Sequence, residues 1–533
     1  MSLETEVARR RTFAIISHPD AGKTTLTEKL LLYGGALQLA GSVTARKNQS
    51  SSASDWMELE RKRGISVSST VLQFDYEGHR INLLDTPGHK DFSEDTYRVL
   101  TAVDAAVMVI DAGKGIEPQT LKLFEVCRLR GIPILTFMNK LDRETKDLLE
   151  LLDELENQLQ LHPYPVNWPM GVGQRFKGVY DRTTKQAHMF ERTVRGAYKA
   201  PVEVAGIDDP VVKDTLDADS YHHFVEQVHL LDAAGAGFDA ADALKGGTTP
   251  VYFGSAVNNF GVQMLLDALI HHAPAPAARA STAGLIPPTR ESFSGFVFKI
   301  QGNMDPKHRD RVAFVRVVSG RFTRDLTVTH SRAGKAYRLA NAHKIFGRDR
   351  EIIEEAYAGD VIGLVGYSDF GIGDTLSEDP KVVYDEIPRF APECFARITN
   401  PNPSKYKPFA KGLEQLLREG VVRSLVPRDL GDAKTTLLAA VGPLQFEVVQ
   451  FRLQSEYGVE SRMEPMGWTL ARWVGPNTKP GAVDAVALPM QSARVKDEDG
   501  NEMILFPTPW SLQYLAEKHP EIELLRLPPA KTR

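Results

Sequence analysis

The segment at residues 17–25 has the composition of a phosphate-binding loop. It reads Ser-His-Pro-Asp-Ala-Gly-Lys-Thr-Thr, follows an apolar run and opens a helical pattern. In such loops, backbone N–H groups at the start of the helix surround phosphate oxygens, the lysine reaches the β- and γ-phosphates and the next hydroxyl binds Mg²⁺. Thr24 is therefore a predicted metal ligand. The predicted phosphate contacts come from Ser17, Asp20, Ala21, Gly22, Lys23, Thr24 and Thr25.

A carboxylate and a histidine follow a second apolar run, at residues 81–84. Asp85 begins the sequence Asp-Thr-Pro-Gly-His. A carboxylate at a strand end can bind Mg²⁺ directly or through water, and Gly88 lets a backbone N–H approach the γ-phosphate. His89 is the catalytic candidate, because a histidine directly after that glycine can orient the attacking water. The alternative is a histidine that only packs beside the loop.

The residues after a later apolar run predict which base is bound. The amide of Asn139 can bond the O6/N7 edge of a purine, and the carboxylate of Asp142 can accept from N1–H and the 2-amino group. Only guanine offers both donors, so the sequence Asn-Lys-Leu-Asp, which includes Lys140, favours GTP and GDP over ATP. Ser255 and Ala256, after another apolar run, would bring a backbone N–H to O6.

A further hydroxyl lies between the phosphate loop and Asp85. The stretch at residues 56–66 is rich in charge and ends at Ser66. Such a hydroxyl can complete Mg²⁺ coordination and order its loop only when γ-phosphate is present. The alternative is a charged helix with a solvated face.

The elements that would position these residues alternate between short apolar runs and helical patterns. Runs of this length between helices are typical of buried parallel strands in a doubly wound α/β domain. Residues 71–76 and 79–84 flank Glu-Gly and predict a hairpin, so one edge strand should be antiparallel. The predicted strands are residues 12–17, 81–84, 105–110, 132–138 and 250–253, and the predicted helices are residues 22–33, 148–161 and 261–271.

The chain as a whole is predicted to be multidomain. A P-loop α/β domain at residues 1–275 would contain an insert at about 163–247, where the strand pattern loosens. The stretch at 273–290 is rich in Pro, Ala and Ser and indicates a linker, placed at 276–292. Short strands with turns predict an antiparallel β-barrel at 293–384. A strand–helix–strand pattern predicts an α+β split βαβ sandwich domain at 385–533.

Composition excludes several classes of protein. The chain has 533 residues, 42% of them apolar and 25% charged, which is typical of a globular protein and excludes a disordered or fibrous chain. The two cysteines, Cys127 and Cys394, are too far apart in the sequence for a CxxC zinc site, and no apolar run is long enough for a membrane span. The pairs His222-His223 and His271-His272 lack a third ligand at metal spacing.

The net charge of 64 − 69 = −5 argues against strong, nonspecific binding to nucleic acid. Basic residues gather only locally, at residues 9–11, at 307–311 and at Lys344, Arg348 and Arg350. We therefore expect patchy, transient contact with RNA, with the patches on the barrel and the third domain.

The four motifs together resemble those of the translational GTPases, and the long insert is similar to that of elongation factor G. Within this family the resemblance is closest to bacterial factors that act at translation termination, and it covers essentially the whole chain. It implies a cytoplasmic, monomeric, ribosome-dependent GTPase that contacts the rRNA of the factor-binding site. It also implies class I release factors as partners, which the GTPase would help to dissociate from the ribosome.

Some positions depart from the common pattern of that family. Ser66 stands where most members have Thr, and Ser17 where most have Gly or Ala; a serine at 66 keeps the hydroxyl for Mg²⁺. The apolar gate beside the catalytic histidine would fall on Pro19 and Ile65, and proline is an unusual gate residue. The chain has no Gly-Gly-Gln, so the resemblance implies action on release factors and not peptide release itself.

Two alternatives stay open at this point. One is another ribosomal role, translocation or drug protection, which the missing two distal domains of elongation factor G disfavour. The other is a ribosome-independent GTPase switch or a P-loop enzyme of metabolite chemistry, which no extra substrate motif supports.

Overall fold

The computed structural model describes residues 2–36, 69–89, 91, 93–191, 202–234, 237–302, 311–346, 349–385, 387, 390–428 and 436–529. Ser66 and Ile65 lie outside these ranges, as do Lys307, His308, Arg309 and Arg348. Within these ranges, no helix is both long and apolar enough to cross a membrane.

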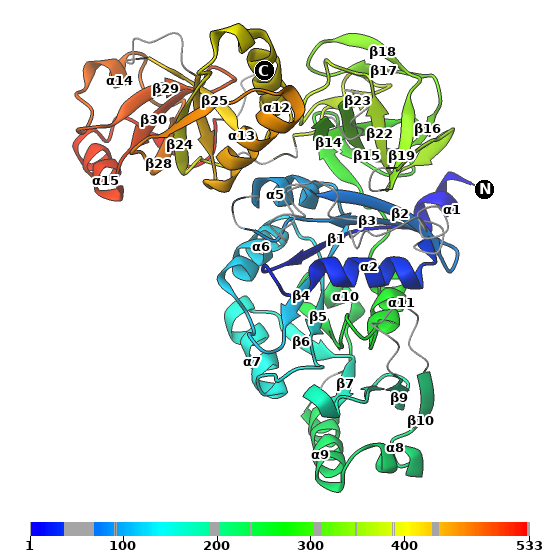
Figure 1. Cartoon of the computed structure of the whole chain (residues 1–533). Helices are drawn as coiled ribbons and strands as arrows, with labels where there is room; N and C mark the ends of the chain where they lie inside the picture. The colour runs from blue at the N-terminus through cyan, green and yellow to red at the C-terminus, as the bar shows by residue number, and fades with distance from the viewer. Residues whose placement is uncertain are drawn as a thin grey trace.

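A seven-stranded sheet forms the centre of the α/β domain, in the order β2-β3-β1-β4-β5-β11-β6 (Figure 1). β2 pairs antiparallel with β3, and every other pair in the sheet is parallel. This arrangement confirms the predicted parallel sheet with one antiparallel edge strand. The strands are β1 (Arg10–Ser17), β2 (Thr70–Tyr76), β3 (His79–Asp85), β4 (Ala105–Asp111), β5 (Ile134–Asn139), β6 (His162–Pro165) and β11 (Thr248–Phe253).

Helices cover both faces of this sheet because alternate strand residues point to opposite sides. Phe13 and Ile15 of β1 pack with α2 and α11, whereas Ala14 and Ile16 pack with α5, α6 and α7. α7 follows its sequence pattern closely, since its buried leucines recur at helical spacing and Asp147 caps its first turn. The helices are α1 (Leu3–Ala8), α2 (Lys23–Tyr33), α5 (Ser93–Thr101), α6 (Pro118–Leu129), α7 (Leu148–Leu159) and α11 (Val262–His272).

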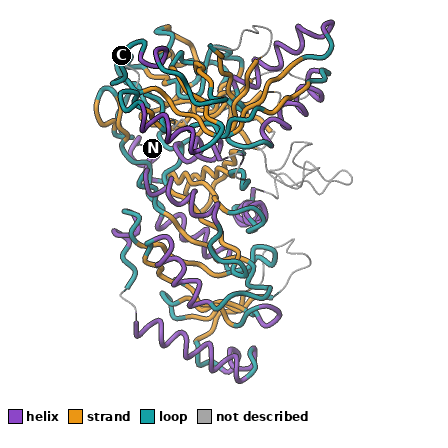
Figure 2. The backbone as a smooth tube through the Cα atoms, turned by 90° about the vertical axis from the view of Figure 1, so that its left-hand side faces the viewer, coloured by secondary structure: helices purple, strands orange, loops and turns teal. Residues whose placement is uncertain are grey.

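The insert has a small sheet of its own, in the order β10-β9-β8-β7. Figures 1 and 2 show it at the end of the α/β domain farthest from the barrel and the third domain. β6 pairs with β11 in the central sheet, so the chain leaves that sheet after Pro165. The insert consists of β7 (Asn167–Met170), β8 (Gly178–Asp181), β9 (Gln186–Phe190), β10 (Val202–Gly206), α8 (Pro210–Thr215), α9 (Ala218–Ala234) and α10 (Ala240–Leu244).

The predicted linker contains a short hairpin. β12 (Arg279–Ser281) and β13 (Gly284–Ile286) pair antiparallel, and the left-handed backbone of Gly284 closes the turn. Arg279 donates a hydrogen bond of 2.7 Å to the carbonyl of Thr101, which fixes the segment to the α/β domain. Composition indicated a linker, whereas the pairing and this anchor make most of it ordered.

The barrel domain is an antiparallel sheet of eight strands in the order β18-β17-β23-β14-β15-β22-β19-β20, with a separate pair of β16 and β21. Its core contains Phe293, Val297, Val315 and Leu364. The strands are β14 (Ser294–Gly302), β15 (Arg311–Ser319), β16 (Arg321–Thr323), β17 (Leu326–His330), β18 (Lys335–Leu339), β19 (Ala342–Phe346), β20 (Asp349–Ile352), β21 (Glu355–Tyr357), β22 (Val361–Val365) and β23 (Thr375–Ser377).

The third domain confirms the predicted strand–helix–strand pattern. α12 (Tyr406–Arg418) and α13 (Leu444–Tyr457) pack on β24 (Cys394–Thr399) and β26 (Thr436–Ala440). β29 and β30 form a hairpin that turns at Gly500, and α15 follows it. The remaining elements are β25 (Arg423–Pro427), β27 (Arg462–Pro465), β28 (Leu470–Val474), α14 (Ala482–Ala485), β29 (Ala493–Lys496), β30 (Glu502–Phe506), α15 (Pro509–Lys518) and β31 (Leu524–Leu525).

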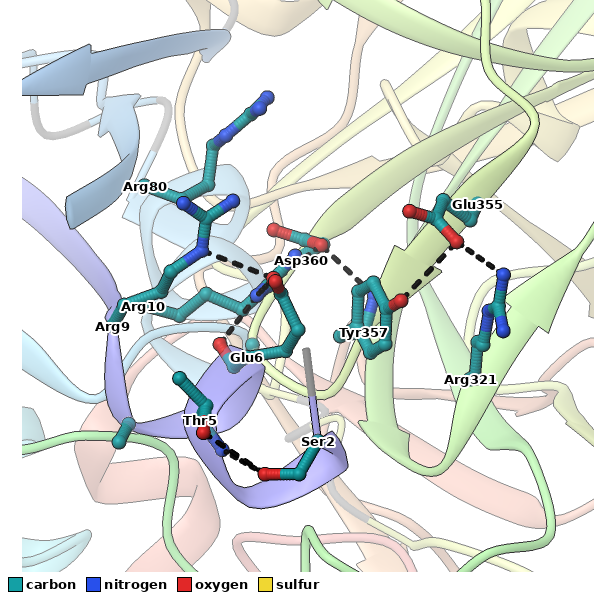
Figure 3. Close-up of polar contacts among 12 residues, drawn as sticks. Ser2, Thr5, Glu6, Arg9, Arg10, Arg80, Arg321, Glu355, Tyr357 and Asp360 are labelled. Atoms are coloured by element: carbon teal, nitrogen blue, oxygen red, sulfur yellow. Dashed lines mark hydrogen bonds and ion pairs between the residues drawn. The ribbon is translucent and has the colours of Figure 1, made fainter. Parts of the chain in front are cut away.

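Buried ion pairs join the barrel to the α/β domain. Arg10 lies 2.8 Å from Asp360 of the barrel and 2.7 Å from Glu6, and Asp360 also accepts a hydrogen bond from the backbone of Tyr357 (Figure 3). Burial alone would lower the pKa of Arg10, but Asp360 and Glu6 outweigh it and raise that pKa above its ordinary value. Arg316 of β15 forms a second buried ion pair across this interface, with Asp104 of the α/β domain at 2.6 Å.

These contacts correct one expectation. The basic run at residues 9–11 was expected as a local basic patch, yet its guanidinium groups bind the protein. Arg9 pairs with Glu6, Arg10 with Asp360, and Arg11 donates to the carbonyl of Ile270. The partners are in part hundreds of residues away, so the sequence pattern did not show them.

We predict that Asp360→Ala lowers the free energy of unfolding by about 3 kcal/mol, because it leaves Arg10 as a partly unpaired buried charge. The measurement is the midpoint of thermal unfolding. Glu355→Ala is the matched control: the Glu355–Arg321 pair lies in the same network but both side chains are about half exposed, so its loss should cost less than about 1 kcal/mol. Equal shifts for the two variants would contradict the role given to the buried pair.

Candidate nucleotide-binding site

The register of the central sheet brings the phosphate loop, the Asp85 segment and the Asn139 segment to one edge. Ser17 ends β1, Asp85 ends β3 and Asn139 ends β5. Ile15 lies opposite Asp85, and Asp111 lies opposite Asn139. Since carboxyl ends of parallel strands meet at the same edge, loops far apart in the sequence form one site there.

The phosphate loop needs glycine at one position. Gly22 has a φ of 99° and directly precedes α2, and a Cβ on it would lie 2.3 Å from Nδ2 of Asn139. The first N–H groups of α2 have no acceptor inside the helix. Glycine at position 22 therefore leaves room for the amide of Asn139, and N–H groups at a helix start are donors that can receive phosphate oxygens.

Lys23 and Asp85 form a buried ion pair at the centre of this edge. The ammonium group of Lys23 donates to Oδ1 of Asp85, and both side chains are almost fully buried. Gly88 lies against the phosphate loop, since a Cβ there would be 3.5 Å from the backbone of Pro19. The Asp85 carboxylate and the neighbouring Thr24 hydroxyl are the hard oxygen donors that Mg²⁺ prefers, so the donor set fits this ion. The third predicted ligand, Ser66, is outside the described residues.

The base-recognition residues form a hydrogen-bonded cluster. Asn139 donates from Nδ2 to the carbonyl of Ala21 at 2.8 Å and accepts at Oδ1 from the backbone N–H of Ala256 at 3.0 Å. The Ser255 hydroxyl donates to Asp142 at 2.6 Å and orients its carboxylate. The amide of Asn139 was expected to face the purine; in the structure it mainly ties the phosphate loop to the loop after β11.

His89 lies at the start of the segment that leads into α5. Its Nδ1 accepts a hydrogen bond of 3.3 Å from the backbone N–H of Asp91, and its side chain is 29% exposed. Of the predicted gate, Pro19 lies beside Gly88, and Ile65 is not described.

Comparison with known proteins identifies the family. The chain is 55% identical to peptide chain release factor 3 of Gloeobacter violaceus over 529 residues, which are 99% of both chains. It is 54% identical to peptide chain release factor 3 of Gloeothece citriformis over 99% of this chain and 97% of the relative. The chain belongs to the peptide chain release factor 3 family.

The family models match three regions of this chain. Residues 8–275 match the elongation factor Tu GTP binding domain, residues 292–379 match elongation factor G domain 2, and residues 384–516 match the C-terminal domain of the class II release factor RF3. The chain is a GTPase, and its fold is the predicted α/β, β-barrel and α+β combination. A solved structure from Thermus thermophilus has the same arrangement, with a TM-score of 0.68 and 25% identity over 86% of this chain and 67% of the other.

Sequence reasoning missed several polar residues near the site. Lys140 has a left-handed backbone and its ammonium group binds Asp111 at 2.7 Å. Nε2 of His18 lies 3.1 Å from Glu117, which precedes α6. A signal was available for Asp111, which ends an apolar run as Asp85 does. No such signal was available for Glu117, because its partner His18, in the phosphate loop, lies 99 residues earlier (117 − 18).

Other candidates carry no chemistry. Burial raises the pKa of the Cys127 thiol to about 12, so this thiol stays protonated in the core. Among the residues with described positions, no three His, Cys, Asp or Glu side chains are grouped as a metal site. The histidine pairs therefore stay without a third ligand within that part of the chain.

We predict that Asp142→Asn weakens GTP binding at least about 100-fold, because two charge-assisted hydrogen bonds to guanine are lost. The Asn amide can donate to the C2 carbonyl of xanthine, so xanthosine triphosphate should now bind better than GTP. Titration with fluorescent nucleotide analogues measures the affinities for GTP and for xanthosine triphosphate. Asp111→Asn is the control, since Asp111 binds Lys140 and should leave the preference for guanine unchanged. Retained preference for GTP in Asp142→Asn would contradict the assignment.

Proposed function

We propose that this chain is a ribosome-dependent GTPase that promotes dissociation and recycling of class I release factors from the ribosome after termination. The observation that carries the proposal is similarity to peptide chain release factor 3 along 99% of both chains, third domain included. We further propose that it works in the cytoplasm as a monomer and that it contacts the rRNA of the factor-binding site.

The proposed domain division places the α/β GTPase domain at residues 1–275, with its insert at about 163–247, and the linker at 276–292. The barrel takes 293–384 and the third domain 385–533. The matched regions of the family models, which end and begin near the same residues, support this division.

In the proposed site, the phosphates lie on the backbone of residues 17–25 and against Lys23. Thr24, Asp85 and Ser66 hold Mg²⁺, which neutralises charge on the β- and γ-phosphates. Asp142 recognises the guanine base, together with Ser255 and Ala256. The shared strand edge and the contacts of Asn139 support this reading, because they bring all three loops within reach of one nucleotide.

The proposed catalytic step depends on His89. Its ring orients the attacking water toward the γ-phosphate, and Gly88 supplies a backbone N–H on the same side. Lys23 binds Asp85 through one of its three N–H donors, so the others would be available to phosphate oxygens. Asp85 would also supply a carboxylate oxygen to a bound Mg²⁺.

We predict that His89→Ala lowers the ribosome-stimulated rate of GTP hydrolysis at least about 100-fold, the usual loss for a group that positions or activates the nucleophile. Affinity for GTP should change less than about threefold, because the proposed role of the ring is to orient water and not to bind the nucleotide. Rapid-quench measurement of hydrolysis with and without ribosomes gives the rates. A normal stimulated rate in His89→Ala would remove His89 from the mechanism.

A second measurement tests the biological role. A fluorescently labelled class I release factor, bound to a termination complex, should dissociate faster when this protein and GTP are added. The protein with Asp142→Asn is the control, because GTP at the same concentration should no longer support the acceleration. No acceleration by the unaltered protein would overturn the proposed function; fast GTP turnover without ribosomes would favour a ribosome-independent switch.

A further inference from the structure

Asp91 lies at the junction of the α/β domain and the third domain. Its side chain is 2% exposed, and its Oδ2 accepts a hydrogen bond of 2.8 Å from the backbone N–H of Leu444. Leu444 is the first residue of α13, so a carboxylate of one domain caps a helix of another. A negative charge at this end of a helix is favourable, because the helix dipole is positive there.

The third domain makes room for this carboxylate. A Cβ on Gly442 would lie 2.1 Å from Cγ of Asp91 and 2.5 Å from its Oδ1. The other N–H groups at this turn have a partner inside the domain, since Gln445 accepts from Val441 at 2.8 Å and from Gly442 at 3.2 Å. Pro443 offers no side-chain cap, so the cap of α13 comes from Asp91.

The same residue contacts the catalytic candidate. The backbone N–H of Asp91 donates to Nδ1 of His89 at 3.3 Å, and Oδ1 of Asp91 lies 3.4 Å from that nitrogen. Asp91 therefore faces His89 with its backbone and α13 with its carboxylate.

Further contacts hold the junction together on the α5 side. Glu94 binds both Arg98 of its own helix and Arg423 of β25, and Arg98 donates to the carbonyl of Gly420 at 3.1 Å. Burial alone would raise the pKa of Glu94, but Arg423 and Arg98 outweigh it and hold that pKa below its usual value. The ring centroids of Tyr97 and Phe390 are 4.4 Å apart. The turn that contains Asp91 is thus placed by the third domain.

We propose that Asp91 is a positioning residue for His89, and that the start of α13, in the third domain, holds Asp91 in the position that orients the ring. The inference rests on the proposed role of His89. It adds that GTP hydrolysis depends on the seating of the third domain at Gly442 and Leu444, so a change in this contact alters the reaction without altering nucleotide binding.

The test compares variants on the two sides of the contact. Asp91→Ala removes the carboxylate, and Gly442→Ala pushes it away while leaving the α/β domain unchanged in sequence. Both should lower kcat of ribosome-stimulated hydrolysis about tenfold or more, while GTP affinity and the KM for ribosomes stay within about twofold. Asp91→Asn keeps an acceptor of the same shape for the Leu444 N–H and should restore most of the rate.

Gly467→Ala is the matched control, because a Cβ on this glycine of the third domain meets nothing within 4 Å. Its rate should equal that of the unaltered protein. Gly442→Ala also keeps the test informative where Asp91→Ala folds poorly, as judged by thermal unfolding with GDP bound.

The background of His89→Ala separates this inference from the proposed function. Adding Asp91→Ala or Gly442→Ala to His89→Ala should cause no further loss of rate, since all three act through one ring. A full further loss would overturn the positioning role, as would a normal rate in both Asp91→Ala and Gly442→Ala. A normal rate in His89→Ala itself would instead overturn the proposed catalytic role.

Discussion

A charge that is buried between domains must keep its partner, and this constraint governs how the three domains of the chain fit together. Taking an ion out of water costs several kcal/mol, which only a close opposite charge or hydrogen bond can offset. Arg10 pairs with Asp360 across the barrel interface, and Glu94 pairs with Arg423 across the interface with the third domain. Neither domain can move off the α/β domain without either hydrating these groups or providing new partners.

The two interfaces differ in where they touch the nucleotide site. The barrel contacts lie at the amino end of β1, with Arg10, and after the end of α5, with Asp104. The third domain contacts α5 and the turn that follows His89 directly. The barrel also reaches the residue just before β2, because Lys299 binds the Ser69 hydroxyl at 2.9 Å. Both the barrel and the third domain therefore contact segments that adjoin the nucleotide site.

Much of the α/β domain could be predicted from the sequence, because its signals are local. Apolar runs between helices indicate parallel strands. The phosphate loop and the Asn-Lys-Leu-Asp segment can be recognised from their own residues. The antiparallel barrel and the split βαβ pattern of the third domain were likewise predicted. The hairpin at β12 and β13 was not, since three-residue strands fall below what periodicity can resolve.

The interdomain contacts could not be predicted for a different reason. Arg10 appeared as part of a basic run, and its partner Asp360 lies 350 residues away, so only the folded chain brings them together. Asp91 appeared as one acid among many after the histidine motif. Its role depends on Gly442 of the third domain, because a side chain at that position would collide with the Asp91 carboxylate.

The contact at Asp91 is asymmetric, because the α/β domain contributes a side chain and the third domain contributes backbone. Gly442 and Leu444 contribute only backbone groups to it, so the third domain sets the position of the carboxylate without adding a charge to the site. Asp91 lies between the Asp85–His89 segment and α5, and its backbone N–H donates to the histidine ring. Under the proposed role of Asp91, a motion of the third domain would therefore reach His89 through this residue.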